Sequence, residues 1–331
     1  MDESGSDSQP KRAKRVLALA ALLFVAVQLC IGLALDRAPL RVRFREAADA
    51  LDRVRNAGPT PDVVLFGSSR FKALILPEVT EARLRERLGE GAPRVTSLSF
   101  NGGDLIGTDI LLQRVLAQGA RPRIALIELT PEWLRYPVPF INGQLLRAFT
   151  WSDVVDWLPE LLLGTKRTLI CARLFPVYCY RNELLTWTTG RAPPYLAAPE
   201  SPSHSRRAQR DDPRHGAQRW HRRMRGYSVS EHAIAVLERI LDRCRYAGIE
   251  CVLVEPPVSS EHREILGGEL ERAFRDALER LRAKRDLPFA DFSDRLPDDG
   301  FHDSTHGNRS GGERFSVIVA DEVIEPRWRA R

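Results

Sequence analysis

Hydrophobic residues fill one long stretch near the N-terminus and then return as short runs between amphipathic segments. The long stretch, residues 16–35, reads VLALAALLFVAVQLCIGLAL, with Gln28 as its only strongly polar side chain. At about 1.5 Å of rise per residue, a helix of this length spans the roughly 30 Å hydrocarbon core of a bilayer. We predict one transmembrane helix here, because the stretch is longer than the apolar region of a signal peptide and lacks a small-residue cleavage site.

Beyond this span, apolar runs of strand length alternate with helical patterns. The predicted strands cover residues 62–66, 94–99, 124–129, 250–254 and 289–292, and the predicted helices cover residues 42–56, 77–88, 109–118, 230–247, 263–285 and 311–324. Such alternation implies right-handed crossovers and a parallel sheet covered on both faces. The predicted fold class is therefore α/β, a three-layer α/β/α flavodoxin-like parallel sheet preceded by one N-terminal transmembrane helix.

The remaining segments fit around these two parts. Residues 1–15 are polar and charged and are predicted to be a disordered cytoplasmic tail, and residues 36–60 a linker helix. The α/β domain is predicted to cover residues 61–331. Within it, residues 136–227 break the alternation and are predicted to be an irregular insertion, with residues 199–219 as a mobile excursion.

Composition and charge narrow the class of protein. The chain has 331 residues, is 43% apolar and carries a formal charge of +6, values that suit a globular domain. Its arginines are spread among acidic residues rather than gathered in a basic stripe with aromatics, so a nucleic-acid partner is not expected. The cysteines lack metal-ligand spacing with histidines, and no metal is expected. Cys171 and Cys179 are left open as a disulfide or as two buried thiols.

Basic residues flank the apolar span on both sides. They are Lys11, Arg12, Lys14 and Arg15 before it, and Arg37, Arg41, Arg43 and Arg45 after it. The preceding tail is short, whereas charges on a large domain count for less in setting topology. We therefore expect a cytoplasmic N-terminus, a single-pass protein of the cytoplasmic membrane, and an extracytoplasmic domain.

Two polar motifs interrupt the apolar pattern at opposite ends of this domain. Residues 63–70 read VVLFGSSR, in which the first strand breaks at Gly67 into two serines. Residues 301–316 read FHDSTHGNRSGGERFS, in which Asp303 and His306 stand three residues apart. The two motifs follow the first and last predicted strands, and ligand sites of open parallel sheets lie outside the carboxyl ends of their strands. The fold therefore allows the two motifs to meet.

These residue types suit nucleophilic catalysis. A serine hydroxyl needs an adjacent imidazole to take its proton, the role we predict for His306, and a carboxylate such as Asp303 orients that imidazole. Ser68 and Ser69 lie at a strand-to-helix turn whose backbone amides could stabilise an oxyanion. Either serine could instead be only a helix cap, with Ser68 as cap or second-choice nucleophile. His302 is interpreted as a bystander.

Together the motifs resemble the SGNH, or GDSL-like, hydrolase superfamily. FGSSR is similar to its first block and DSTH to its last, which implies Ser69 as nucleophile, Asp303 as orienting acid and His306 as base. The longer C-terminal motif resembles the F-x-D-x-x-H-x-N-x-x-G pattern of membrane-anchored members, which include proteins that assist polysaccharide O-acetylation and teichoic-acid D-alanylation. The resemblance covers residues 62–109 and 250–323, not the central insertion.

The resemblance also implies oxyanion donors. Besides the amide of Ser69, the segment SFNGG supplies Gly102 or Gly103 as a backbone donor, with Asn101 nearby. After the third strand, ELTPEW replaces the family's GxND, so the usual asparagine donor is missing; either Asn101 substitutes for it or the oxyanion hole is weaker. Losing one donor costs on the order of 100-fold or more in rate.

Two acidic residues end strands on the same sheet edge. Glu128 and Glu255 are candidate substrate contacts, although strand-end carboxylates often bond only to loop amides. The resemblance implies a membrane-anchored serine esterase or O-acyltransferase that acts on an ester or acyl group of a cell-envelope polymer or lipid. It implies no cofactor, and a multipass membrane acyltransferase as a candidate partner. The alternative is a non-catalytic scaffold or partner protein of such an acyltransferase complex.

Overall fold

The computed structural model describes residues 8–37, 44–56, 61–135, 149–158, 163–190, 220, 222 and 224–330. The chain divides into two compact units, Met1–Arg45 with Leu146–Pro199, and Glu46–Leu145 with Glu200–Arg331. The second unit holds the sheet and every predicted site residue. The central part of the chain therefore leaves the α/β unit and returns to it.

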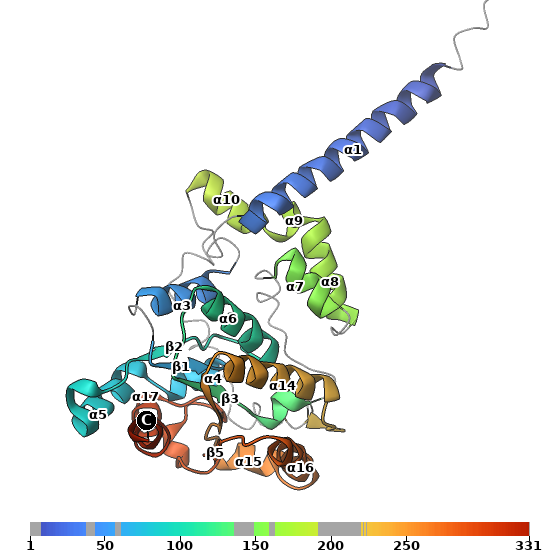
Figure 1. Ribbon diagram of the computed structural model, residues 1–331. Helices are drawn as coiled ribbons and strands as arrows, with labels where there is room; N and C mark the ends of the chain where they lie inside the picture. The colour runs from blue at the N-terminus through green and yellow to red at the C-terminus, as the bar shows by residue number, and fades with distance from the viewer. Residues whose placement is uncertain are drawn as a thin grey trace, which may run out of the picture. The chain divides into compact units, whose positions relative to one another are not determined.

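Among the described residues, five parallel strands form one sheet in the second unit (Figure 1). In the order β2-β1-β3-β4-β5 across the sheet, their bounds are β2 Val95–Ser97, β1 Val63–Phe66, β3 Ile124–Glu128, β4 Glu250–Glu255 and β5 Phe289–Asp291. Strands β1 and β3 are buried along their whole length, as central strands covered on both faces should be. The predicted α/β class is confirmed, and the strand order is that of flavodoxin-like folds.

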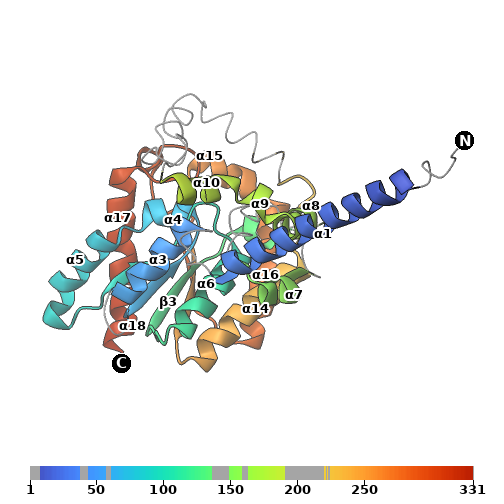
Figure 2. The same cartoon turned by 90° about the horizontal axis from the view of Figure 1, so that it is seen from above.

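Helices cover both faces of this sheet (Figure 2). Their bounds are α3 Arg45–Asn56, α4 Ser69–Leu74, α5 Pro77–Leu88, α6 Leu105–Ala117, α14 Glu231–Tyr246, α15 Ser260–Leu266, α16 Glu269–Lys284, α17 Arg309–Val319 and α18 Glu325–Arg329; short 3₁₀ or π segments are η1 Gly89–Gly91, η2 Pro131–Leu134, η5 Asp298–Gly300 and η6 Ala320–Ile324. Helices α5 and α17 contact each other on one face, and α6, α14 and α16 lie on the other. Phe71, Leu84 and Phe315 are fully buried in the core beneath α4, α5 and α17.

Two local features depart from the predicted elements. The predicted helix over residues 263–285 is two helices, α15 and α16, because two consecutive glycines interrupt it and Gly268 has φ +73°. Directly after β1 the chain forms α4, which is only six residues long and too short to show a helical period in the sequence. This short helix carries the candidate nucleophile.

The first unit is helical where it is described. Its helices are α1 Ser8–Arg37, α7 Trp151–Trp157, α8 Leu163–Leu174, α9 Pro176–Cys179 and α10 Arg181–Thr189. Because α1 begins at Ser8, residues 8–15 of the predicted disordered tail are helical, and residues 1–7 lie outside the described residues. Lysine and arginine favour helix, and the apolar span that follows extends it. Cys171 and Cys179 are free thiols.

The insertion that was predicted to be irregular forms helices in its described part. Thr150 and Asp153 make a capping box at the start of α7, and Gly190, with φ +65°, ends α10. Local caps and packing within the unit define these helices. A prediction from the period of apolar residues along the chain therefore missed them. Residues 199–219, the predicted mobile excursion, lie outside the described residues.

Helix α1 is long and apolar enough to cross a membrane over Arg12–Arg37. One of its faces contacts α8 and α9 within the same unit. The ring of Phe24 lies 6.4 Å from the ring of Phe175, and Gln28 Oε1 accepts a hydrogen bond from the amide of Val177 (3.3 Å). The one strongly polar side chain of the apolar span is therefore bonded inside the unit rather than left without a partner.

Candidate active site

The structure brings together Ser69, His306 and Asp303, although Ser69 and His306 are 237 positions apart in the chain. Ser69 Oγ lies 2.8 Å from His306 Nε2, and His306 Nδ1 lies 2.9 Å from Asp303 Oδ2. Because Nδ1 faces a carboxylate, that nitrogen carries the imidazole proton and Nε2 is left to accept from the serine hydroxyl. These are the distances and the order of contacts that proton removal from a serine requires.

A tight loop presents the acid and the imidazole. Asp303 Oδ1 accepts hydrogen bonds from the backbone amides of Thr305 (2.8 Å) and His306 (2.7 Å), so the aspartate folds the loop that it shares with the histidine. Two residues beyond His306, Asn308 caps helix α17 by accepting from the amide of Gly311 (2.9 Å). The spacing of Asp, His and Asn in the motif follows from this turn and cap.

The environment keeps Asp303 ionised. Burial by itself would raise the pKa of the Asp303 carboxyl, but the hydrogen bond and charge of His306, together with the amides of Thr305 and His306, outweigh it and hold the pKa below its ordinary value. An ionised carboxylate beside Nδ1 stabilises the imidazolium that forms when Nε2 takes up a proton.

Ser68 binds a buried carboxylate and caps the helix that begins at the candidate nucleophile. Its amide and its Oγ donate to the two carboxylate oxygens of Glu128 (2.6 and 2.9 Å), and its Oγ also accepts from the amide of Arg70, capping α4. A Cβ at position 67 would lie 2.7 Å from Glu128 Oε2 and 2.5 Å from Phe71 Cβ, so only Gly67 lets the carboxylate approach. Glu128 is fully buried, and burial raises its pKa despite Arg70 and Ser68.

A second carboxylate holds the other neighbour of Ser69. Glu132 Oε1 accepts from Arg70 Nη2 (2.7 Å) and lies 3.0 Å from His262 Nε2, and all three side chains are buried. Burial opposes ionisation of Glu132, but the charge of Arg70 and the hydrogen bond from His262 outweigh it and lower the pKa of Glu132. The ring of Trp220 completes this buried cluster, 5.1 Å from the guanidinium of Arg70 and 5.5 Å from the His262 ring.

The sequence did not point to this cluster. Arg70 follows the two serines, and Glu132 belongs to the ELTPEW segment that departs from the family pattern. That departure was the available signal: Glu128 at the end of β3 and Glu132 just after it bond the two neighbours of Ser69, where the resemblance implied an asparagine donor. His262, at the start of α15, carries no sequence signal of its own, because a lone histidine is common in any fold.

The predicted oxyanion donors differ in their availability. The amide of Gly103 donates to the carbonyl oxygen of Phe100 (3.0 Å), and the amide of Asn101 donates to Glu46 Oε1 (3.1 Å), so both amides are engaged. Within the described residues, the amides of Ser69 and Gly102 have no hydrogen-bond partner. The backbone donors that remain are therefore these two.

The turn that contains Gly102 lies against the nucleophile turn. A Cβ at position 103 would lie only 2.3 Å from the carbonyl oxygen of Gly67, so Gly103 is required for this close approach. Gly102 has φ +69°, which a residue with a side chain seldom adopts. The two glycines thus serve backbone geometry that places the turn beside the serine.

Glu255, the other predicted substrate contact, is tied to neighbouring elements. Its side chain is 6% exposed, and Arg275 Nη2 lies 3.0 Å from Glu255 Oε2 and 2.7 Å from Asp291 Oδ2. Burial raises the pKa of Glu255 to about 8, with Arg275 opposing the rise. The Glu255 carboxylate is therefore paired with Arg275 of α16, which also pairs with Asp291 of β5.

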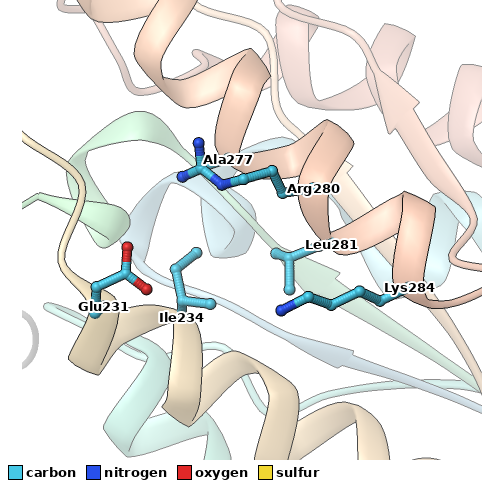
Figure 3. A pocket seen from close by; sticks show the side chains of 6 residues that line it. All are labelled: Glu231, Ile234, Ala277, Arg280, Leu281 and Lys284. Atoms are coloured by element: carbon cyan, nitrogen blue, oxygen red, sulfur yellow. The ribbon is translucent and has the colours of Figure 1, made fainter.

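A small pocket of about 40 Å³ lies elsewhere on the second unit, between α14 and α16 (Figure 3). Its lining residues are Glu231, Ile234, Ala277, Arg280, Leu281 and Lys284. None of the residues predicted to act in the site lines it. This pocket is therefore separate from the candidate active site around Ser69.

The sequence matches no protein-family model and no curated protein. Solved structures do match: a protein assigned as an acylhydrolase from Bacteroides fragilis is 11% identical over 80% of this chain and 91% of its own, with a TM-score of 0.36. A protein assigned to the G-D-S-L lipolytic family from Desulfitobacterium hafniense is 10% identical over 79% and 98% (TM-score 0.36). An alpha/beta hydrolase from the metagenome of Lake Arreo, Spain, is 12% identical over 78% and 93% (TM-score 0.37).

Proposed function

We propose that the chain is a serine-dependent esterase or O-acyltransferase. The observation that carries the proposal is the continuous chain of contacts from Ser69 Oγ through the two nitrogens of His306 to Asp303, with distances of 2.8 and 2.9 Å. Ser69 Oγ attacks the carbonyl carbon of an ester while His306 Nε2 takes the hydroxyl proton. The imidazolium then gives that proton to the leaving alcohol, and an acyl group remains on Ser69.

The second half of the reaction releases this acyl group. Water or an acceptor hydroxyl attacks the acyl carbon, His306 removes its proton, and the bond to Ser69 Oγ breaks as the proton returns to the serine. Backbone amides of Ser69 and Gly102 are the donors available for the oxyanion that forms in each half. In this proposal the two backbone donors stand in for the asparagine that the resemblance implied.

Helix α1 supports the proposed localisation. An apolar helix long enough to span a bilayer would tether the α/β unit to the cytoplasmic membrane, with the unit outside. A tethered unit in that place would act on an ester or acyl group of a cell-envelope polymer or lipid, beside a multipass membrane acyltransferase. The resemblance of the closing motif to membrane-anchored proteins of this kind supports the same substrate class.

The reaction is tested with a fluorophosphonate probe on the full chain in detergent micelles. Wild type should be labelled on the peptide that contains Ser69, and Ser69→Ala should not be labelled. Ser68→Ala is the matched control: it removes the adjacent hydroxyl and weakens the cap of α4, so labelling should be slower but should remain on Ser69. An unlabelled wild type, or equal labelling of Ser69→Ala, would contradict the proposal.

Three further measurements separate hydrolysis from transfer, an enzyme from a scaffold, and the two possible orientations in the membrane. A hydroxyl acceptor that diverts product from free acid to a new ester indicates transfer rather than hydrolysis. If the chain is instead a non-catalytic scaffold, Ser69→Ala leaves its cellular function intact. A C-terminal alkaline phosphatase fusion reports topology, and an inactive but well-expressed fusion would place the α/β unit in the cytoplasm.

A further inference from the structure

A third potential metal ligand stands beside the Asp303–His306 pair. His302, Asp303 and His306 each offer a ligand atom, and these atoms lie within 4.8 Å of one another. Asp303 Oδ2 lies near both rings, 2.9 Å from His306 Nδ1 and 3.7 Å from His302 Nε2. The side chains are 47%, 36% and 29% exposed in chain order, so an ion can reach them from solvent.

The spacing of these atoms fits tetrahedral zinc. Zinc binds imidazole nitrogen and carboxylate oxygen at about 2.0–2.2 Å, which places neighbouring ligand atoms of a tetrahedron roughly 3.3–3.6 Å apart. The distances of 2.9 and 3.7 Å from Asp303 Oδ2 bracket this edge, and the ligand atoms of the two histidines lie within 4.8 Å of each other. Two histidines and one carboxylate leave the fourth position to water, as in open zinc sites.

The loop is already organised to hold such a set. Asp303 Oδ1 is engaged by the amides of Thr305 and His306, which turns Oδ2 toward the two rings. The amide of His302 donates to the carbonyl oxygen of His306 (3.0 Å), fixing the two histidine backbones relative to each other. An outer shell of hydrogen bonds that orients the ligands is what metal sites use to gain affinity.

We propose that His302, Asp303 and His306 bind Zn²⁺ and that the bound ion switches off the site; the inhibitory part rests on the proposed function. Zinc on His306 Nδ1 takes the lone pair of that nitrogen, so the neutral imidazole must carry its single proton on Nε2. A protonated Nε2 cannot accept the proton of Ser69 Oγ. Zinc also occupies Asp303, which removes the partner of the imidazolium. The ring proton moves from Nδ1 to Nε2 through solvent, and no proton is gained or lost overall.

This assigns a role to His302, which the reaction itself does not use. His302→Gln removes one of three ligands and leaves Ser69, His306 and Asp303 unchanged. Because replacing even an outer-shell partner costs a metal site about 10–100-fold in affinity, losing a direct ligand should weaken zinc binding at least tenfold. Magnesium and calcium prefer all-oxygen ligand sets and should not compete.

Isothermal titration calorimetry with zinc chloride tests the site on the full chain in detergent, without a histidine tag. Wild type and Ser69→Ala should bind one zinc ion with equal affinity, since Ser69 is not a ligand, and His302→Gln should bind it at least about tenfold more weakly. Labelling by the fluorophosphonate probe should slow as zinc saturates the wild type, should recover on addition of EDTA, and should resist the same zinc concentration in His302→Gln.

Three results would overturn the proposal: no zinc binding by the wild type, equal zinc affinity of the wild type and His302→Gln, or zinc binding that leaves the labelling rate unchanged or increases it. Failure of the proposed function has a different signature. A wild type that is not labelled in the absence of zinc contradicts the enzyme, while the calorimetric comparison of wild type with His302→Gln still decides the metal site.

Discussion

Replacing Glu132 by leucine removes the partner that holds Arg70 beside the candidate nucleophile. The Arg70–Glu132 contact is 2.7 Å long, and the two side chains are only 8% and 2% exposed. His262, fully buried, shares the same carboxylate oxygen at 3.0 Å. Glu132→Leu would therefore leave a guanidinium inside the protein without its bonded counter-charge, and a buried imidazole without its acceptor.

The magnitude follows from this burial. Removing one partner of a buried ion pair costs about 3–5 kcal/mol, because the remaining charge is still desolvated. Arg70 keeps the charge of nearby Glu128 and the ring of Trp220, so we expect the lower end, about 3 kcal/mol. The double variant Arg70→Met/Glu132→Leu has no buried charge at this position. It should recover at least half of the loss, since apolar replacements of buried pairs are often neutral.

Denaturant unfolding of the full chain in detergent micelles measures these differences. The control is Glu279→Leu, the same substitution in an exposed ion pair on α16. Glu279 lies 3.1 Å from Arg282, and the two side chains are 70% and 48% exposed. That change should cost less than about 1 kcal/mol. The labelling rate of Ser69 should fall in Glu132→Leu, because Arg70 is the next residue along α4.

Two outcomes would refute this account of Glu132. One is a loss of stability in Glu132→Leu no larger than that of Glu279→Leu. The other is a double variant as unstable as the single one, which would mean that the cost comes from the shape of the leucine rather than from the stranded charge.

Further predictions concern the site and its surroundings. Asp303→Asn should slow labelling of Ser69 by roughly 10³–10⁴-fold, because an amide no longer orients or stabilises the charged imidazole; a loss under tenfold would argue against the assigned role. Gly103→Ala should cost at least about 1–3 kcal/mol in the unfolding assay, since its Cβ would lie 2.3 Å from the carbonyl oxygen of Gly67, and an unchanged midpoint would contradict the close approach. The pKa of Glu255 is raised from 4.5 to about 8, so the folded protein keeps a proton that the unfolded chain releases, and stability should fall as pH rises through this window. Glu255→Gln should remove that slope in the unfolding free energy between about pH 5 and about pH 8, and an unaltered slope would count against the shift.

Some features of this chain are local enough to be read from its sequence. The hydrophobic periods of strands and helices repeat within a few residues. An apolar span of twenty residues predicts a helix of membrane-spanning length whatever the fold of the remaining chain. The relation of Asp303 to His306 is equally local, because a three-residue turn sets it. These features predicted the α/β class, the apolar helix and one half of the site.

Tertiary structure decided the rest. The contact between Ser69 and His306 joins positions 237 residues apart, and it forms because α17, which follows the Asp303–His306 loop, packs against α4 and α5. For Glu128 the sequence left a substrate contact and a bond to loop amides open, and the structure shows the bond to the amide of Ser68. Glu132 had no predicted role, because a carboxylate is ordinarily exposed and becomes tolerable inside a protein only when donors from other elements surround it. Here those donors are Ser68, Arg70 and His262, which come from two separate helices. The chain at and just after the end of β3 lacks the asparagine that the resemblance implied, and its carboxylates instead bond Ser68 and Arg70 on either side of Ser69. Only the tertiary structure shows these contacts.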